Sequence, residues 1–538
     1  MVHADKTGIF VKESHKAMKS YFVFGRVLRE SATLIKLDKS FEVEYTQNFN
    51  KELKGKEFED LFFIKDKLFL LASDYNKKDK SLILYAAELD KPSGEVKGDW
   101  IEVTNWQKEE KSDDIQFNID YNSDSSRMVL VSTIEGKGKN NYEVKEFDLK
   151  FRQVNKAVVI SNEFDKSIFQ LEDVIYTREG NIVLVARIYE YQEGKKKKSK
   201  FLQFVNYNIR IYNPSGTMVK ELNSDVVGKW LVSAKVLQVP GKDLVLAAFY
   251  SNERRKMEVN GMLVQRINPN TGDVVTTSNK QLSTAMIDKI EEDENDEDDD
   301  ESKQERKERE RLEKIQSDDD GFSRYMRFRD FIFTPDSGVI VMAEKFNNYV
   351  IRNVSYTPGT GMGGGRTMVV TYMDVYECGD LMMSKVDVSG NINWLHVLPK
   401  YQREQIDLGS TSSTTGFSMG AGYFRKYMFN RPFYGGFATL KGENHLTIVF
   451  NDHKKNGNVL QLGQKYRRTS VFGKSICFGL KLDMVTGKYT RTELFDNRDQ
   501  PTAMPRLGSA IGKDLYIIGK EDRMFGKSKV AAAKISVK

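Results

Sequence analysis

The chain has 538 residues, 39% of them hydrophobic, which is enough to bury a large core in one repeat assembly or in several domains. Its formal net charge of +6 is the small difference between 83 basic and 77 acidic residues. Without a clustered excess or a recognisable binding motif, this balance argues against nucleic acid as a partner. No run of about 18 apolar residues occurs, so we expect no membrane-spanning helix.

One phrase recurs along the chain, and its clearest copy is DLMMSKVDVSGNINWLHVLPK, residues 380–400. It predicts a strand, a tight turn and a second strand. An Asp or Asn opens most copies of the turn, because its side chain accepts hydrogen bonds from turn amides, and a glycine such as Gly390 supplies positive φ. The copies are separated mostly by about 52 to 65 residues, a spacing typical of repeat architectures. They begin at Asp38, Asp90, Asp148, Asn213, Asn268, Asp387, Asp483 and, in truncated form, Ser536.

Two further apolar runs precede most of these turns, as in FEDLFFIKDK and LFLLASDY before Asp90. Each unit therefore comprises four short strands. The pattern predicts an all-β chain forming one β-propeller domain over residues 1–538, with eight, or alternatively seven, four-stranded blades. A row of β-sandwiches is the other candidate, but it requires linkers that the sequence lacks. The last strand, AAAKISVK, has no fourth strand after it, and GIFVKE near the start is a spare one, so we expect the ring to close by pairing of the N- and C-terminal strands.

Two gaps between copies are longer than the rest. The first contains a charged insert, residues 290–320, whose acidic half we expect to be disordered and whose basic half we expect to form a short helix. It also contains TPGTGMGGGRT, which predicts a hairpin loop. The second contains IDLGSTSSTTGFSMGAGYF, residues 406–424, which predicts a long loop because Gly, Ser and Thr dominate it.

The motifs that would carry chemistry are weak. The glycine run 359–367 lacks a following Lys-Ser/Thr and a helix, and GFSMG at 416–420 lacks the strand and helix of a nucleophile elbow. The acidic run has no calcium-loop spacing, and the five histidines have no zinc spacing. His453 beside Asp452 is a candidate for acid–base work on a loop, but a hairpin-turn histidine is the interpretation we favour. We therefore assign no catalytic, cofactor-binding or metal-binding residue. Cys378 and Cys477 are expected to be buried reduced thiols, with a single bridge as the alternative.

Two stretches alternate aromatic and basic residues, FSRYMRFRDFIF and YFRKYMFNRPFYGGF. Tyr and Arg are typical of binding hot spots, although the same alternation describes an ordinary strand with one face in the core. The stretches supply five candidate partner contacts: Tyr325, Arg327, Tyr423, Arg425 and Tyr427.

Three segments, FRDFIFTPDSGVIVMAEKF, DLMMSKVDVSGNINWLHVLPKYQ and LTIVFNDHKKN, give residues 322–458 a resemblance to uncharacterised envelope-associated propeller-like proteins of Bacteroidota. That resemblance implies a periplasmic or cell-surface location. The first residues, MVHADKTGIFVKESHK, show no export signal, which leaves both a cytoplasmic protein and a mature exported form open. We expect a non-enzymatic scaffold that binds a protein partner, such as outer-membrane or secretion machinery, through rim loops. The alternative is a glycan-binding or hydrolytic propeller with a site in its central channel.

Overall fold

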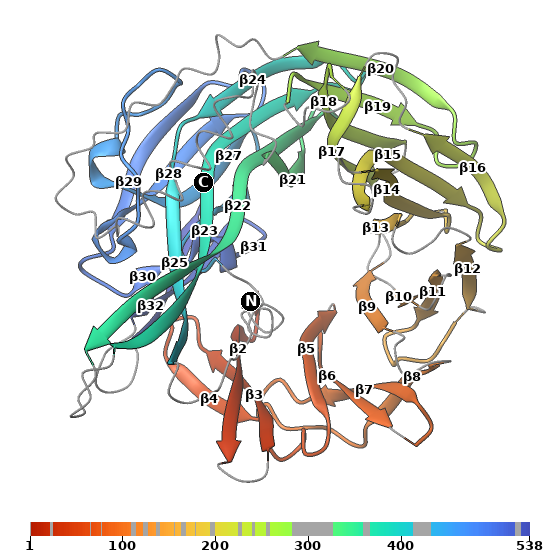
Figure 1. Cartoon of the computed structure of the whole chain (residues 1–538), viewed down its shortest axis with the longest axis vertical. Helices are drawn as coiled ribbons and strands as arrows, with labels where there is room; N and C mark the ends of the chain where they lie inside the picture. Colours follow the sequence, from red (N-terminus) through yellow and green to blue (C-terminus); the bar gives the residue numbers. More distant parts are fainter. Residues whose placement is uncertain are drawn as a thin grey trace. The chain divides into compact units, whose positions relative to one another are not determined.

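The structure is a computed structural model, and it shows an all-β chain of antiparallel sheets (Figure 1). It divides into two compact units. The first comprises residues 1–248, 252–254 and 264–277, and the second comprises residues 249–251, 255–263 and 278–538. The residues described are 2–21, 25–64, 66–76, 78–108, 114–121, 127–135, 140–154, 157–162, 168–177, 179–193, 200–223, 229–238, 243–253, 259–281, 326–358, 366–412, 432–521 and 529–537.

The first unit contains four complete sheets, and each follows chain order from one edge to the other. The first sheet is β1 (Val2–Asp5), β2 (Gly8–Tyr21), β3 (Gly25–Leu37) and β4 (Val43–Asn48). The second is β5 (Glu57–Ile64), β6 (Lys67–Asn76), β7 (Ser81–Leu89) and β8 (Ile101–Gln107). The third is β9 (Asp114–Tyr121), β10 (Met128–Glu135), β11 (Asn140–Phe147) and β12 (Val158–Asn162). The fourth is β13 (Phe169–Tyr176), β14 (Ile182–Glu193), β15 (Lys200–Tyr212) and β16 (Met218–Asn223).

A fifth sheet has residues in both units. It is β17 (Trp230–Gln238), β18 (Leu244–Ser251), β19 (Gly261–Ile267) and β20 (Val274–Gln281).

The second unit contains the last three sheets and three short 3-10 helices. The sixth sheet is β21 (Met326–Phe333), β22 (Val339–Pro358), β23 (Arg366–Val386) and β24 (Ile392–Leu398), with β25 (Gln402–Ser412) also paired to β23. The seventh is β26 (Phe437–Lys441), β27 (His445–Asp452), β28 (Ile476–Asp483) and β29 (Tyr489–Asp496). The eighth is β30 (Thr502–Ala503), β31 (Ser509–Ile511), β32 (Asp514–Glu521) and β33 (Lys529–Ser536). The helices are η2 (Lys454–Asn456), η3 (Phe472–Lys474) and η4 (Pro505–Leu507).

These eight antiparallel sheets confirm the predicted fold class, an eight-bladed β-propeller, and exclude the seven-bladed alternative. The recurring turns confirm their predicted chemistry. The seven full copies each join the third and fourth strands of their sheet, and at Asp387 the side-chain Oδ1 accepts hydrogen bonds from the amides of Ser389 and Asn391, both at 2.9 Å. Gly390 adopts φ 91°, which is favourable only for glycine. The residue types in the turn therefore fix where each blade ends its third strand.

The expected pairing of the two chain ends is not found among the described strands. GIFVKE is not spare, because it begins β2, which lies between β1 and β3 in the first sheet. The strand AAAKIS, within β33, pairs with β32, and no described strand follows it in the eighth sheet. The four residues of β1 already provide the first strand of the first sheet, so GIFVKE is used within its own blade.

The sixth sheet also corrects the loop expected at residues 406–424. Residues 402–412 form β25, and their register along β23 runs from Cys378 opposite Gln402 to Val369 opposite Ser412. Strands β22 and β23 pair over their whole lengths, from Val339 to Pro358 on β22 (Figure 1). Backbone pairing along this long hairpin outweighs the local loop composition of the Ser- and Thr-rich segment. The glycine run 359–365, the insert at 290–320 and residues 413–424 lie outside the described residues.

Apolar strand faces pack sheet against sheet within each unit. In the second unit, Leu446, Ile448 and Phe450 of β27 are fully buried in one cluster with residues of β22, β23 and β28. Both cysteines are buried and unbridged, as predicted, and burial raises the pKa of the Cys378 and Cys477 thiols well above the ordinary value. Within the described residues, no helical segment combines the length and apolar character needed to cross a membrane.

Candidate functional site

The candidate site is the segment from His453 to Ser475, which joins the adjacent strands β27 and β28 and is called here the basic loop. Two adjacent antiparallel strands can be joined by two to five residues, and irregular connections longer than about 12–15 residues are uncommon and are usually either functional or linker segments. The basic loop has 23 residues, includes η2 and η3, and is described over its entire length. Among the connections of the second unit that are described from end to end, it is the longest.

A buried ion pair anchors the start of the basic loop. The Asp452 carboxylate accepts a hydrogen bond from Arg491 Nη2 at 2.8 Å, and the two side chains are 0% and 1% exposed. The Arg491 guanidinium also lies 3.9 Å from the Phe478 ring centroid and 5.0 Å from that of Phe450. Charge pairing and stacking on aromatic faces together offset the cost of removing both charges from water.

The other oxygen of Asp452 ties down three points of the basic loop. Its Oδ1 accepts the His453 amide at 2.7 Å, Asn456 Nδ2 at 2.8 Å and Thr469 Oγ1 at 2.9 Å. Together with Arg491, this gives the carboxylate four donors, so it is fully satisfied as an anion. One side chain thus joins the start of the loop to its far side.

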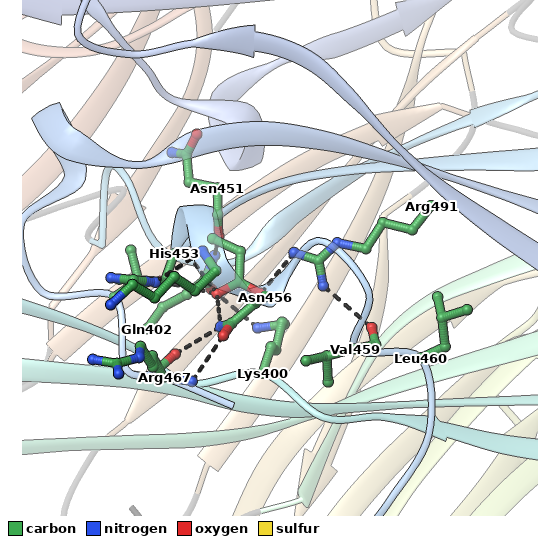
Figure 2. A network of polar contacts seen from close by, with 12 residues as sticks. Lys400, Gln402, Asn451, His453, Asn456, Val459, Leu460, Arg467 and Arg491 are labelled. Carbon is green, nitrogen blue, oxygen red and sulfur yellow. Dashed lines mark hydrogen bonds and ion pairs between the residues drawn. The ribbon is translucent and has the colours of Figure 1, made fainter. Parts of the chain in front are cut away.

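Asn456 closes the neck of the basic loop. Its Nδ2 donates to the Arg467 carbonyl at 2.7 Å, and its Oδ1 accepts the Arg467 amide at 2.8 Å. Figure 2 shows Asn456 among these contacts, with Arg491 reaching the Val459 carbonyl, a contact of 3.4 Å. Residues 457–466 are therefore enclosed between two bonded positions.

The basic loop also crosses to β25 of the sixth sheet. The Thr469 amide donates to the Tyr401 carbonyl at 2.8 Å, and the Arg403 amide donates to the Thr469 carbonyl at 2.9 Å, which makes a parallel bridge between Gln402 and Thr469. Gln402 in turn donates from Nε2 to the Asn451 carbonyl at 2.6 Å. The loop is consequently held by two sheets of the same unit.

A second buried network supports this crossing. Lys400 Nζ is fully buried and donates to Glu344 Oε1 at 2.6 Å, to Gln402 Oε1 at 3.0 Å and to the Cys378 carbonyl at 3.3 Å, which matches its three N–H donors. The other Glu344 oxygen accepts from Arg329 Nε at 3.0 Å. Figure 2 shows Lys400 and Gln402 beside the anchor of the basic loop.

A third carboxylate holds the chain that leads into β26. Glu404 accepts backbone amides from Phe433 at 3.0 Å, Tyr434 at 2.7 Å and Gly435 at 3.3 Å. Three successive amides around one carboxylate form an anion-binding turn, occupied here by a side chain of the same protein. The carboxylates of Glu344, Glu404 and Asp452 therefore all bind groups of the chain itself.

His453 does not form the acid–base pair that its position beside Asp452 suggested. The Asp452 carboxylate contacts the His453 backbone amide, whereas imidazole Nδ1 accepts the Lys455 amide at 3.1 Å and caps η2. This is the interpretation favoured from the sequence, a turn histidine. The described residues contain no group of three or more His, Cys, Asp or Glu side chains arranged to hold a metal ion.

Of the five candidate partner contacts, only Arg327 lies in the described part of the chain. It is an exposed residue of β21, opposite Glu344 in the strand register. Tyr325, Tyr423, Arg425 and Tyr427 lie outside the described residues, so they remain predictions. The sequence did not predict that Asp452 and Arg491 form the buried ion pair that anchors the loop. The loop itself had a readable signal, since its 23 residues contain six Lys or Arg and no Asp or Glu.

No protein-family model matches this sequence, and no curated protein matches it either. Among solved structures, prolyl oligopeptidase B from Galerina marginata is similar at 12% identity and a TM-score of 0.28, covering 69% of this chain. This chain spans only 37% of that protein's length. An ACO/RPE65 chimera gives 9% identity and a TM-score of 0.35 over 93% of this chain and 90% of its own. Synechocystis apocarotenoid oxygenase gives 9% identity and a TM-score of 0.28 over 76% and 92%. Similarity at this level carries no argument about function.

Proposed function

We propose that the protein is a non-enzymatic interaction scaffold of the cell envelope, which binds a protein partner through loops at the ends of its blade strands. The observation that carries the proposal is the basic loop, a long ordered connection anchored by a buried ion pair between Asp452 and Arg491. A loop that is already ordered loses little conformational entropy when a partner binds. Rigid sheets that position a loop are the usual basis of binding surfaces.

The chemistry of the anchor supports binding rather than catalysis. A general acid or base must exchange a proton with a bound molecule, and so one of its oxygens must face that molecule. The carboxylates of Glu344, Glu404 and Asp452 are instead directed at donors of the chain itself. Their role is to hold backbone in place.

The location follows from the resemblance of residues 322–458 to exported propeller-like proteins of Bacteroidota. An envelope scaffold would contact another envelope protein, and outer-membrane or secretion machinery is the class of partner we expect.

Cross-linking in native envelopes tests this function. An amine-reactive cross-linker should connect one protein preferentially to Lys454 and Lys455 of the basic loop, and much less to the exposed Lys481 and Lys488 at the opposite end of β28. Cross-links spread evenly over both pairs would contradict a scaffold role for this loop. Turnover of a glycan or peptide substrate by the purified chain would contradict the non-enzymatic assignment.

A further inference from the structure

The basic loop carries a local charge excess that the whole chain does not have. Its six basic residues are Lys454, Lys455, Lys465, Arg467, Arg468 and Lys474, and no acidic residue lies between His453 and Ser475. All four lysines are exposed, and both arginines are partly exposed. The chain as a whole has a net charge of only +6 over 538 residues. Charge clustered on one ordered segment attracts anions far more effectively than charge scattered over a surface.

The backbone presents the first two lysines in a fixed position. Lys454 and Lys455 form η2 directly after the His453 cap, and the Asn456 amide donates to the His453 carbonyl at 2.9 Å. Further along, Gln464 Oε1 accepts the amides of Leu460 at 2.7 Å and Gln461 at 2.9 Å. The cations are thus displayed on a preorganised loop, which lowers the entropic cost of binding.

Two carboxylates beside the basic loop are already paired with arginines, and the exposed Glu493 of β29 also lies near Gly457. Asp496, at the end of β29, has a pKa lowered first by its hydrogen bonds from Arg498 and, more weakly, by the charge of Lys454. Asp452 is buried and paired with Arg491. Asp496 and Asp452 are therefore each already engaged by an arginine.

The composition of the basic loop selects among polyanions. Single-stranded nucleic acid needs exposed aromatic faces for base stacking, but Tyr466 and Phe472, the two aromatic residues of the loop, are 7% and 6% exposed. A membrane surface needs an apolar face that enters the lipid, and Val471 is the single exposed large hydrophobic side chain of the loop. The exposed side-chain amides of Asn458 and Gln461 can donate and accept hydrogen bonds with a peptide backbone and its carboxylates.

We propose that the basic loop binds an acidic peptide segment of a protein partner, with Lys454 and Lys455 contacting its carboxylates. This inference rests on the proposed scaffold function and specifies the chemistry of the partner. Exposed charge pairs contribute mainly to association rate and specificity, so the interaction is salt-dependent.

The test uses the full chain and a fluorescein-labelled poly-glutamate peptide, with binding followed by fluorescence anisotropy at low and at physiological salt. The charge-reversed variant Lys454→Glu/Lys455→Glu should weaken binding by roughly tenfold, since two exposed contacts are replaced by two repulsions. The matched control Lys481→Glu/Lys488→Glu changes the net charge by the same amount at the end of β28 that is farther from the basic loop. It should alter binding less than about twofold.

Three binding results would overturn the inference. In the first, both double variants weaken peptide binding equally, and in the second, neither variant weakens it. In the third, vesicles of phosphatidylglycerol or a single-stranded oligonucleotide bind the loop more tightly than the peptide does. An unchanged unfolding temperature in both variants excludes misfolding as the cause. If Lys454→Glu/Lys455→Glu loses the peptide while the same envelope protein is still cross-linked through other lysines of the chain, the partner contacts another surface and the inference fails. If Lys454→Glu/Lys455→Glu binds the peptide as tightly as the unaltered protein does, and the unaltered protein still forms the envelope cross-link at the basic loop, the inference fails and the scaffold function stands.

Discussion

The Asp452–Arg491 pair provides the sharpest test of how the basic loop is held. Replacing Arg491 with Met keeps much of the contact with Phe478 but leaves the Asp452 carboxylate buried without its cation. Removing one partner of a buried pair typically costs about 3–5 kcal/mol. Because Asp452 retains three other donors, we expect the lower end, about 3 kcal/mol.

The double variant Asp452→Asn/Arg491→Met separates charge from packing. Asparagine keeps an oxygen that can accept from His453, Asn456 and Thr469, while the unpaired charge is gone. The double variant should therefore be more stable than Arg491→Met alone, by about 1.5 kcal/mol or more.

Hydrogen exchange measures this locally, which avoids treating so long a chain as a two-state system. The amides of Asn456 and Arg467, both bonded within the loop neck, should exchange roughly a hundredfold faster in Arg491→Met, since about 1.4 kcal/mol corresponds to a factor of ten. The amide of Asn391 in the Asp387 turn serves as an internal reference and should not change. Two results would refute the anchoring role. One is unchanged amide exchange at the neck in Arg491→Met, and the other is exchange in the double variant that is as fast as in Arg491→Met or faster.

Three further predictions concern the same unit. His396 is stacked on Trp394, and its pKa is lowered first by burial and then by the charge of Lys280, so the folded state binds its proton less readily than the unfolded state. The free energy of unfolding should therefore fall as the pH drops below about 6.5. Urea titrations at several pH values should show a flatter pH dependence for His396→Phe. Gly487 has φ 74°, and a Cβ there would lie 2.7 Å from atoms of Trp394 and His396. Gly487→Ala should therefore destabilise the protein by about 1–3 kcal/mol more than Gly512→Ala, where φ is also positive but the space is open. Equal losses of stability in calorimetry would contradict this packing argument. Glu404→Gln should cost about 1–2 kcal/mol and speed amide exchange at residues 433–435, with unchanged exchange there counting against a charge-assisted turn.

Some local features were predictable because they depend on a few adjacent residues. The turn at Asp387 needs only an acceptor at its first position and Gly390 at positive φ, and both are visible in the sequence. Residues 406–412 were predicted as loop from equally local information, and the prediction was wrong because their partners on β23 lie more than thirty positions earlier in the chain. The charge of the basic loop was also visible, but not the fact that the loop is ordered.

The repeat, its spacing and the turn chemistry can be read from the sequence, because they depend on residues close together in the chain. The anchor exists only in the folded protein. Asp452 and Arg491 lie 39 positions apart, and Lys400 and Glu344 lie 56 positions apart, on strands that become neighbours only when the sheets pair and pack. A buried charge is stable only beside its partner, and nothing in a linear sequence marks which distant residue that partner will be.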